Sequence, residues 1–472
     1  MTRTKIICTI GPSTSCYEKI LELLDAGMNV ARINFSHGTH EEHAILISYL
    51  KKARLEKKVP LAIMVDTRGP EIRLGEIAGG SLVVKAHDKI YLANPSSLEH
   101  ITLNPAEVFP YLEPGIKVLF DDGYIEGRVV EKKEHLVTVE ILNSGILKSY
   151  KSVALPNLHL QLTEMTQQDI RDLSFACAQD VDWIAASFIR SADHIHAISN
   201  LLAVNGKYDI SVMAKIESAE GVTNFDSILP MTQGIMVARG DLGVELPLEK
   251  VPSLQKFMIR KCRELSKPVV TATQMLESMI YNPRPTRAEV SDVANAIYDS
   301  SSAVMLSGET AVGKYPVEAV AMMRKVIRQT ELDFDYRGFY DQNLSLDFTN
   351  VSSSIASAAV QTAYMTKARA IFVFTVTGAT ARLISRFRPE MPIFALTPSE
   401  KTYHQLSMEW GVIPSYAEAN LTLEEAIAYT SRFALVTKQA REGDFVVITT
   451  GTPFWSEGTT NTLIVEKISS IL

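Results

Sequence analysis

The sequence predicts an α/β fold: a (β/α)8 barrel of the TIM type with an inserted small β-barrel lid domain and a C-terminal α/β domain. Two observations carry this prediction. Short apolar runs rich in β-branched residues alternate with amphipathic stretches eight times before residue 331. The alternation is interrupted once, by about a hundred residues with a different pattern, and a loop of that length without its own structure is rare in a compact domain.

The eight apolar runs are expected to be parallel strands, because an amphipathic stretch of helix length follows most of them. The expected strands are residues 5–10, 29–34, 61–66, 181–186, 211–217, 234–238, 269–273 and 303–306. The expected helices are residues 17–26, 41–57, 168–179, 191–205, 218–228, 248–266, 287–300 and 316–329. Reacting side chains of such barrels lie at the carboxyl ends of the strands, so the candidate site is sought there.

The interrupting segment is expected to form a β domain over residues 72–157, because stretches such as 136–140 alternate with the period of a half-buried strand. It projects from the reactive face and is expected to close over it like a lid. The barrel then consists of residues 1–71 and 158–331. Residues 332–472 are expected to form a separate α/β domain, with helices at 352–365 and 379–387 and strands at 370–375, 393–396, 445–450 and 463–467.

Composition excludes several classes of function. Of 472 residues, 46% are hydrophobic and 21% are charged, as in ordinary globular proteins. The net charge of -7 gives no basic field for a nucleic-acid backbone. No apolar run reaches the ~20 residues that span a bilayer, so no membrane partner is expected. The four cysteines are scattered and no secretory apolar region opens the chain, which indicates a reduced, cytoplasmic protein.

The most informative residues stand at the ends of the fifth and sixth expected strands. Side chains along a strand have a period of two, so Lys215 and Glu217 project to the same face, and Asp241 follows the next strand. Two carboxylates suit a divalent cation such as Mg²⁺ (or Mn²⁺), and a lysine beside them neutralises charge that develops on a substrate oxygen. An ordinary strand ion pair is the plainer alternative, but charges inside a barrel are costly unless they are used.

A second cation site is expected at the ends of the second and third strands. Four oxygen donors with one formal charge suit a monovalent cation better than a divalent one. These donors are Asn34, Ser36, Asp66 and Thr67. Arg32, on the same strand face, and Arg73 supply planar guanidinium groups that match phosphate oxygens.

Further polar groups follow the last three strands. Gly240 and Asp241 open a new segment whose backbone N–H groups are suited to a carboxylate, and Thr273 ends the seventh strand. Ser307 and Glu309 follow the eighth strand and are candidates to bind substrate oxygens or relay a proton.

A turn in the C-terminal domain opens a helix, a geometry that can hold a phosphate. Its candidate residues are Thr375, Thr377, Gly378 and Thr380. A capped helix start without a ligand is the plainer alternative, since Thr and Gly are common there.

Two other motifs favour a structural interpretation. His37, His40 and His43 resemble a zinc cluster, but Thr39 followed by Glu42 indicates a helix capping box. Residues 308–314 resemble a P-loop. Tyr315, however, occupies the position of the Ser or Thr whose hydroxyl binds magnesium in a P-loop.

Together, these residues resemble the pyruvate kinase family. The chain is similar to that family in five motifs, in order and spacing, and the match covers essentially the whole chain. The motifs are residues 30–38, 66–73, 213–217, 238–243 and 305–311.

The resemblance implies transfer of the phosphoryl group of phosphoenolpyruvate to ADP, giving pyruvate and ATP in the last step of glycolysis. It assigns Lys215 to the phosphoryl group in flight and to the enolate oxygen, Glu217 and Asp241 to Mg²⁺, and the four donors of the second cation site to K⁺. Substrate-binding and catalytic roles fall to Arg32, Lys215, Gly240, Asp241 and Thr273. Nucleotide binding falls to Asn34, His37, Arg73 and Lys151.

The resemblance also implies a homotetramer, a phosphorylated effector and, because Glu stands at position 71, a requirement for K⁺. The sequence departs from the family at residues 151–156, at Glu42 and at Val376, which affects lid geometry, nucleotide affinity and effector identity. Two rival functions stay open: a magnesium-dependent aldolase or lyase acting on pyruvate enolate, and a non-catalytic metabolite sensor.

Overall fold

Eight parallel strands close into a barrel in the computed structural model, which describes residues 2–94, 100–156, 158, 163–343, 350–419, 421–455, 458 and 460–469. The predicted eight-stranded barrel is therefore confirmed. In order around the barrel, the strands are β1 (Lys5–Ile10), β17 (Ala303–Leu306), β16 (Val269–Ala272), β15 (Gly234–Ala238), β14 (Ser211–Ile216), β13 (Trp183–Ala186), β3 (Ala62–Asp66) and β2 (Val30–Asn34).

Apolar side chains fill the barrel and separate it from its helices. Methionines such as Met64, Met213 and Met236 pack inside, and Met408 of the C-terminal part joins the same buried cluster. The surrounding helices are α1 (Tyr17–Ala26), α2 (His40–Lys57), α3 (Gln167–Ala178), α4 (Ala192–Val204), α5 (Ala219–Thr223), α6 (Phe225–Met231), α7 (Arg239–Glu245), α8 (Val251–Glu264), α9 (Arg287–Tyr298), α10 (Gly308–Ala311) and α11 (Pro316–Leu332).

Two predicted helices are wrong in extent. The helix expected at 218–228 is two short helices, α5 and α6, because Asn224 between them leaves helical geometry, with ψ at 10°. The helix expected at 248–266 begins as α8 at Val251, after a 3₁₀ turn, with a proline in its first turn. Proline fits there because it lacks the N–H that a helix start leaves unpaired.

The inserted segment folds as a mostly antiparallel seven-stranded sheet and a two-stranded ribbon with their own apolar core. The sheet is β12 (Val153–Ala154), β8 (Lys117–Phe120), β9 (Ile125–Lys133), β10 (Leu136–Ile141), β6 (Lys89–Ala93), β7 (Ile101–Asn104) and β4 (Arg73–Leu74), and the ribbon is β11 (Gly145–Lys148) with β5 (Ser81–Val84). The predicted boundary at 157 lies outside the described residues, and the domain boundaries stay predictions.

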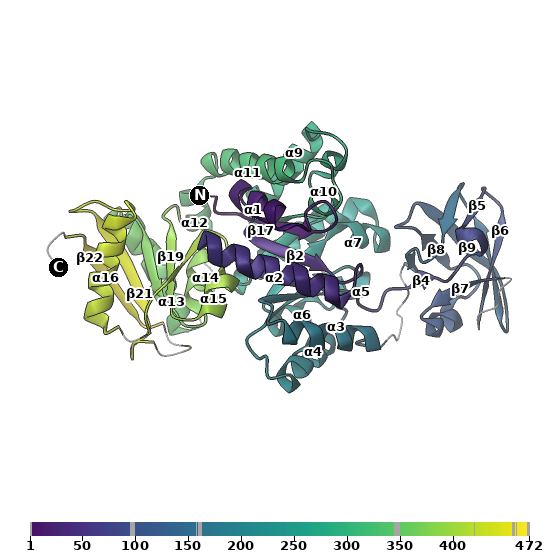
Figure 1. Cartoon of the computed structure of the whole chain (residues 1–472), viewed down its shortest axis with the longest axis horizontal. Coiled ribbons are helices and arrows are strands. Elements are labelled where there is room, and N and C mark those ends of the chain that lie inside the picture. The colour runs from purple at the N-terminus through teal and green to yellow at the C-terminus, as the bar shows by residue number, and fades with distance from the viewer. Residues whose placement is uncertain are drawn as a thin grey trace.

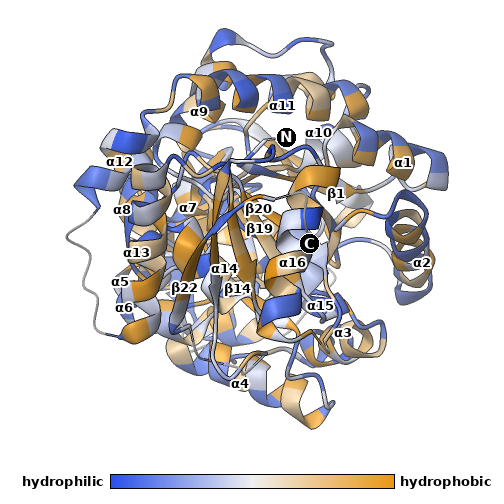
Figure 2. Cartoon of the chain, turned by 90° about the vertical axis from the view of Figure 1, so that its left-hand side faces the viewer, coloured by the Kyte–Doolittle hydropathy of each residue, from blue (hydrophilic) through white to orange (hydrophobic). Residues whose placement is uncertain are grey.

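The C-terminal part is a five-stranded sheet, parallel except for its last strand. Its strands are β20 (Val412–Tyr416), β19 (Ile393–Thr397), β18 (Ile371–Phe374), β21 (Phe445–Thr450) and β22 (Thr462–Lys467). Its helices are α12 (Tyr336–Gln342), α13 (Val351–Thr366), α14 (Ala379–Ser385), α15 (Glu400–Gln405) and α16 (Leu423–Val436). Figure 2 shows the apolar strands between α13 and α16. The predicted α/β class is confirmed, although β20, α12, α15 and α16 were not predicted individually.

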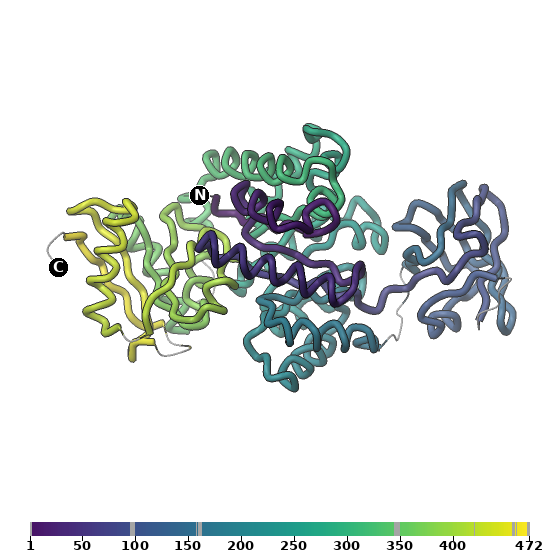
Figure 3. Tube along the Cα trace, in the orientation of Figure 1, coloured from purple at the N-terminus to yellow at the C-terminus, as the bar shows by residue number. Residues whose placement is uncertain are grey.

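The three parts lie in a row, with the barrel between the C-terminal sheet and the inserted sheet (Figures 1 and 3). The chain leaves the barrel after β3 and enters the inserted sheet at β4. The carboxyl ends of the barrel strands face the insert, since one pocket is lined by Phe188 and Asp241 from the barrel and Asp122 from the insert. The inserted sheet therefore lies over the polar groups at the carboxyl ends of the barrel strands.

Candidate active site

Lys215 is the centre of the polar groups at the barrel mouth. It lies on β14, is 8% exposed, and its Nζ is 3.0 Å from Glu217 Oε1 and 2.9 Å from Asp66 Oδ1. Burial alone would lower the pKa of Lys215, but Asp66 and Glu217 outweigh burial and raise it. The ammonium group is therefore firmly charged.

Glu217 and Asp241 meet beside this lysine, as the strand period predicts. Glu217 directly follows β14, and Asp241 lies in the first turn of α7, directly after β15. The two side chains share a hydrogen bond, and burial raises the pKa of both carboxyl groups. Two carboxyl groups in contact, Glu217 buried and Asp241 partly exposed, need a proton or a cation between them, and oxygen ligands of this kind suit Mg²⁺.

The predicted second cation site gathers around Asp66, which ends β3. Asn34 lies opposite Asp66 in the parallel register of β2 and β3. Arg32 Nε donates to Asp66 Oδ2 at 2.7 Å, and Arg32 with Lys215 holds the pKa of Asp66 below its usual value despite burial, which acts the other way. Asn34 Oδ1 accepts the Ser36 amide at 3.1 Å, and Thr67 Oγ1 accepts the Ser187 amide at 3.1 Å. The four predicted oxygen donors thus stand at neighbouring strand ends.

Ser187 and Phe188, which follow β13, belong to this site although sequence reasoning did not select them. The Ser187 hydroxyl accepts a hydrogen bond from Lys215 Nζ at 2.7 Å and donates one to the Thr67 carbonyl at 2.6 Å. The Phe188 amide donates to Glu217 Oε2 at 2.5 Å. Phe188 has a φ of 53°, a strained value for a bulky residue that persists only where surrounding contacts hold it. The rule that strand ends carry the site points to these two positions, but not to the contacts that they make.

We expect Ser187→Ala to lower turnover by about tenfold, because it removes one of the acceptors that hold the Lys215 ammonium group, a contact worth roughly 1.5 kcal/mol. Steady-state kinetics would check this, with Ser174→Ala as the control because Ser174 bonds only a backbone carbonyl on α3. Unchanged turnover in Ser187→Ala would contradict the positioning contact.

Thr273 and Gly240 face each other across the ends of β16 and β15. The Gly240 amide donates to Thr273 Oγ1 at 2.8 Å, and that hydroxyl donates to the Ala272 carbonyl at 2.6 Å. Thr273 and Gln274 both have positive φ values, 68° and 54°. For a β-branched residue this is strained backbone, which clusters at functional sites.

The predicted phosphate-facing residues of the insert are engaged by carboxylates. Arg73 Nη2 lies 2.6 Å from Glu71 Oε2, and Lys151 Nζ lies 2.7 Å from Asp121 Oδ1. His37 follows β2, and its pKa is lowered by burial and by nearby arginines, Arg73 first. Burial and the arginines around His37 keep its imidazole neutral, and the arginines leave this corner of the site positively charged, which suits an anionic ligand.

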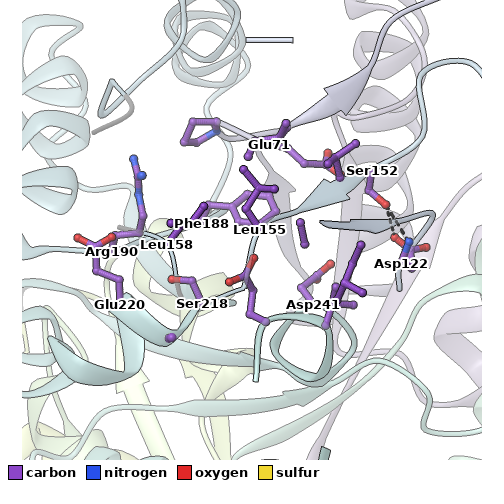
Figure 4. Close-up of a pocket in the computed structure, with 18 of the residues that line it drawn as sticks. Glu71, Asp122, Ser152, Leu155, Leu158, Phe188, Arg190, Ser218, Glu220 and Asp241 are labelled. Carbon is purple, nitrogen blue, oxygen red and sulfur yellow. Dashed lines mark hydrogen bonds between the residues drawn. The ribbon is translucent and has the colours of Figure 1, made fainter. Parts of the chain in front are cut away.

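The barrel and the insert enclose a pocket of about 240 Å³. Figure 4 shows Asp241 on its barrel side, Glu71 above it, and Asp122 bonded to Ser152 of the insert. Arg190 and Glu220 lie together at the opposite end. The pocket therefore extends from the ends of the barrel strands to the inserted sheet.

Ser307 and Glu309 follow β17, but the Glu309 carboxylate is already engaged. Its two oxygens accept the amides of Leu276 at 3.0 Å and of Ser307 at 2.8 Å. Burial raises the pKa of Glu309. These contacts give Glu309 a structural role, and the proton relay stays a prediction.

The predicted phosphate-holding turn lines a separate cavity of about 610 Å³ in the C-terminal part. Thr375, Thr377 and Thr380 line it, and the Gly378 amide donates to Thr375 Oγ1 at 3.0 Å. Gly378 has a φ of 79°, which glycine adopts without strain.

The capping box at the start of α2 is confirmed, with Thr39 and Glu42 each bonding the other's backbone amide. Within the described ranges, no group of three or more His, Cys, Asp or Glu side chains is arranged to hold a metal ion. No helix in the described part of the chain is both long and apolar enough to cross a bilayer.

The fold and these groups define a class: an α/β-barrel enzyme whose strand ends bring paired cations and carboxylates to bear on an anionic substrate.

Comparisons with known proteins identify the family. The family model described as "Pyruvate kinase, barrel domain" matches residues 1–320, and that described as "Pyruvate kinase, alpha/beta domain" matches residues 353–466. The chain belongs to the pyruvate kinase family, whose members are phosphotransferases. It is 49% identical to the pyruvate kinase of Chlamydia muridarum over 89% of each chain. It is 42% identical to that of Geobacillus stearothermophilus, over 100% of this chain and 81% of the relative. It is 41% identical to that of Clostridium acetobutylicum, over 99% of this chain and 100% of the relative.

Proposed function

We propose that this chain transfers the phosphoryl group of phosphoenolpyruvate to ADP, giving pyruvate and ATP, as the last step of glycolysis in the cytoplasm. The phosphorus–oxygen bond of the enol phosphate breaks, a β-phosphate oxygen of ADP takes the phosphoryl group, and the enolate gains a proton at carbon. One observation carries the proposal: Lys215, Arg32, Glu217 and Asp241 converge at one barrel mouth from separate strands.

Lys215 and Arg32 supply the positive charge that this reaction needs. Phosphoryl transfer requires mainly positioning and neutralisation of charge on the transferred group. In the proposal, Arg32 binds the phosphate, and Lys215 stabilises both the phosphoryl group in flight and the enolate oxygen. Thr273 with the amides of Gly240 and Asp241 holds the substrate carboxylate. Because the Lys215 ammonium group is buried among fixed partners, it needs little reorganisation as charge develops.

Glu217 and Asp241 are the proposed ligands of Mg²⁺ (or Mn²⁺). Mg²⁺ is commonly held by one or two carboxylates together with substrate oxygens, which fits a pair of hydrogen-bonded carboxyl groups of which Asp241 faces the pocket. The bound cation would neutralise phosphate charge and align the two substrates.

Asn34, Ser36, Asp66 and Thr67 are the proposed K⁺ ligands. Asn34 Oδ1, Thr67 Oγ1 and Asp66 Oδ2 each accept one protein hydrogen bond, so these oxygens retain a lone pair for a cation. Asp66 Oδ1 already accepts two, from Ser187 and Lys215. Its single carboxylate favours a monovalent ion.

We expect K⁺ to raise the reaction rate at least several-fold over Na⁺ or tetramethylammonium at equal ionic strength, because the four oxygen donors around Asp66 are the proposed K⁺ site. A rate assay with Mg²⁺ and both substrates saturating measures this. Full activity in strictly K⁺-free buffer would contradict the assignment.

The nucleotide is proposed to bind between barrel and insert, at Asn34, His37, Arg73 and Lys151. Arg73 and Lys151 pair with Glu71 and Asp121 in this structure. Phosphate groups would compete with those carboxylates for the same cations, so nucleotide binding would loosen both pairs.

A phosphorylated effector is proposed for the cavity lined by Thr375, Thr377 and Thr380, where the turn offers hydroxyls at a helix start. A homotetramer is part of the proposal and would be tested by light scattering on the purified chain.

A coupled assay of pyruvate formation from phosphoenolpyruvate, with and without ADP, tests the proposed function. The proposal expects product only with ADP. Product without ADP would favour the lyase, and no product under either condition would favour the sensor.

A further inference from the structure

The contact between the barrel and the C-terminal sheet contains a concentration of positive charge that the proposed reaction does not use. A small cavity there has a volume of about 10 Å³. Five basic side chains and one acidic side chain line it, from both parts of the chain. The basic residues are Arg263, Lys267, Arg382, Arg386 and Arg388, and the acidic one is Glu409. We call this group the seam cluster.

Three of these guanidinium groups lie against aromatic rings. Arg263 lies 4.9 Å from the ring centre of Phe339, Arg386 lies 4.7 Å from that of Phe387, and Arg388 lies 4.7 Å from that of Trp410. An aromatic face stabilises a cation but accepts no in-plane hydrogen bond from it. The N–H groups at the edges of these planes are therefore left to other partners.

Arg388 makes its hydrogen bonds through its two terminal nitrogens, Nη1 and Nη2. Its Nη1 donates to the Ser385 carbonyl at 2.9 Å, and its Nη2 donates to the Ser300 carbonyl at 2.8 Å. The side chain is 4% exposed, yet among the described residues its Nε has no hydrogen-bond partner, and neither has Arg263 Nε. A buried guanidinium N–H without an acceptor carries the full cost of its lost hydration.

The single carboxylate of the seam cluster balances little of this charge. Glu409 Oε1 lies 3.9 Å from Arg382 Nε, and Arg382 also donates through Nη2 to the Thr377 carbonyl at 3.0 Å. Lys267 is satisfied by backbone carbonyls of residues 229, 230 and 232. Burial lowers the pKa of Arg388 to about 9, and the Arg263 charge adds to that effect. The cavity thus lies among more positive charge than the protein neutralises.

We infer that the seam cluster binds a small monatomic anion such as chloride, held by the Nε groups of Arg263 and Arg388. A cavity of this volume has room for about one water-sized particle, which favours a monatomic anion over the larger phosphate and sulfate. Since Arg263 lies on α8 and Arg388 follows α14, the bound anion bridges the barrel and the C-terminal sheet. Glu409 competes with the anion for the same positive charge.

Bromide is the probe for the test, because it replaces chloride and scatters anomalously. Crystals of the full chain soaked in bromide are expected to show an anomalous peak between Arg263 and Arg388. In solution, bromide or chloride added at constant ionic strength against gluconate is expected to raise the melting temperature and then saturate, since a ligand that binds only the folded state stabilises it. Gluconate is too large for the cavity.

Three variants separate a site from a general salt effect. Arg263→Gln is expected to weaken the halide response at least tenfold. Arg260→Gln is the matched control, because Arg260 lies one turn earlier on α8, is largely exposed and pairs with Glu264. The halide response of Arg260→Gln should equal that of the unsubstituted protein. Glu409→Gln removes the competing charge and is expected to lower the half-saturating bromide concentration by about tenfold.

The inference is overturned if bromide occupies other surface sites but leaves the seam cluster without a peak. It is equally overturned if Arg260→Gln and Arg263→Gln change the halide response alike, since this would indicate general screening. The inference is also overturned if the cavity holds a water molecule, and no bromide, at saturating bromide.

Discussion

Replacing Lys215 by methionine is expected to lower turnover by about 10²- to 10³-fold, the usual cost of removing one well-aimed charge-stabilising donor. Methionine retains most of the side-chain volume, so the barrel packing should survive. The loss arises because no other cation contacts both Asp66 and Glu217 in the described site. Steady-state rates at saturating phosphoenolpyruvate, ADP, Mg²⁺ and K⁺ measure the effect.

The control for Lys215→Met is Lys207→Met. Lys207 also pairs with a carboxylate, at 2.8 Å from Asp180, but it stands outside the barrel mouth. It should keep normal turnover. Near-normal activity of Lys215→Met, with an unchanged melting curve, would refute the role proposed for this lysine.

Glu217→Gln is expected to raise the Mg²⁺ concentration for half-maximal rate at least tenfold and to lower turnover about a hundredfold. Glutamine keeps an oxygen that can accept the Phe188 amide, but it removes one of the two negative charges proposed to hold the cation. The remaining Asp241 then offers a site of half the charge. Initial rates measured against free Mg²⁺, and again with Mn²⁺, report the change.

Glu220→Gln supplies the comparison for Glu217→Gln. Glu220 lines the same pocket but lies at the end beside Arg190 (Figure 4). Its Mg²⁺ curve should match that of the parent. If the parent, Glu217→Gln and Glu220→Gln gave the same dependence of rate on free Mg²⁺, Glu217 would not be a ligand of the metal.

The barrel and the convergence at its mouth were predictable because both follow from short-range rules. Period two places Lys215 and Glu217 on one face, and the parallel barrel brings Asp66 and Asp241 to the same end. The break between α5 and α6 was missed because an asparagine only weakly disfavours a helix interior, although Asn224 is of a type favoured at helix starts. Propensity is a weak guide where tertiary contacts decide.

The contacts of Ser187 and Phe188 lay beyond sequence reasoning for another reason. A serine and a phenylalanine after a strand have no chemical signature, and the positive φ of Phe188 depends on contacts with residues far along the chain. The pairs of Arg73 with Glu71 and of Lys151 with Asp121 depend on how the insert folds. Sequence spacing alone does not specify which carboxylate the long side chain of Arg73 or Lys151 will contact in the folded protein.

The pairing of β1 with β17 has a consequence for synthesis on the ribosome. The first barrel strand finds its neighbour only when residues 303–306 exist, because Lys5 to Cys8 align with Ala303 to Leu306. Until that stretch has left the exit tunnel, the nascent chain holds an open sheet whose two edges lack partners. Nearly two thirds of the polypeptide must therefore be synthesised before the barrel can close. A chaperone would be needed most during this stage of synthesis.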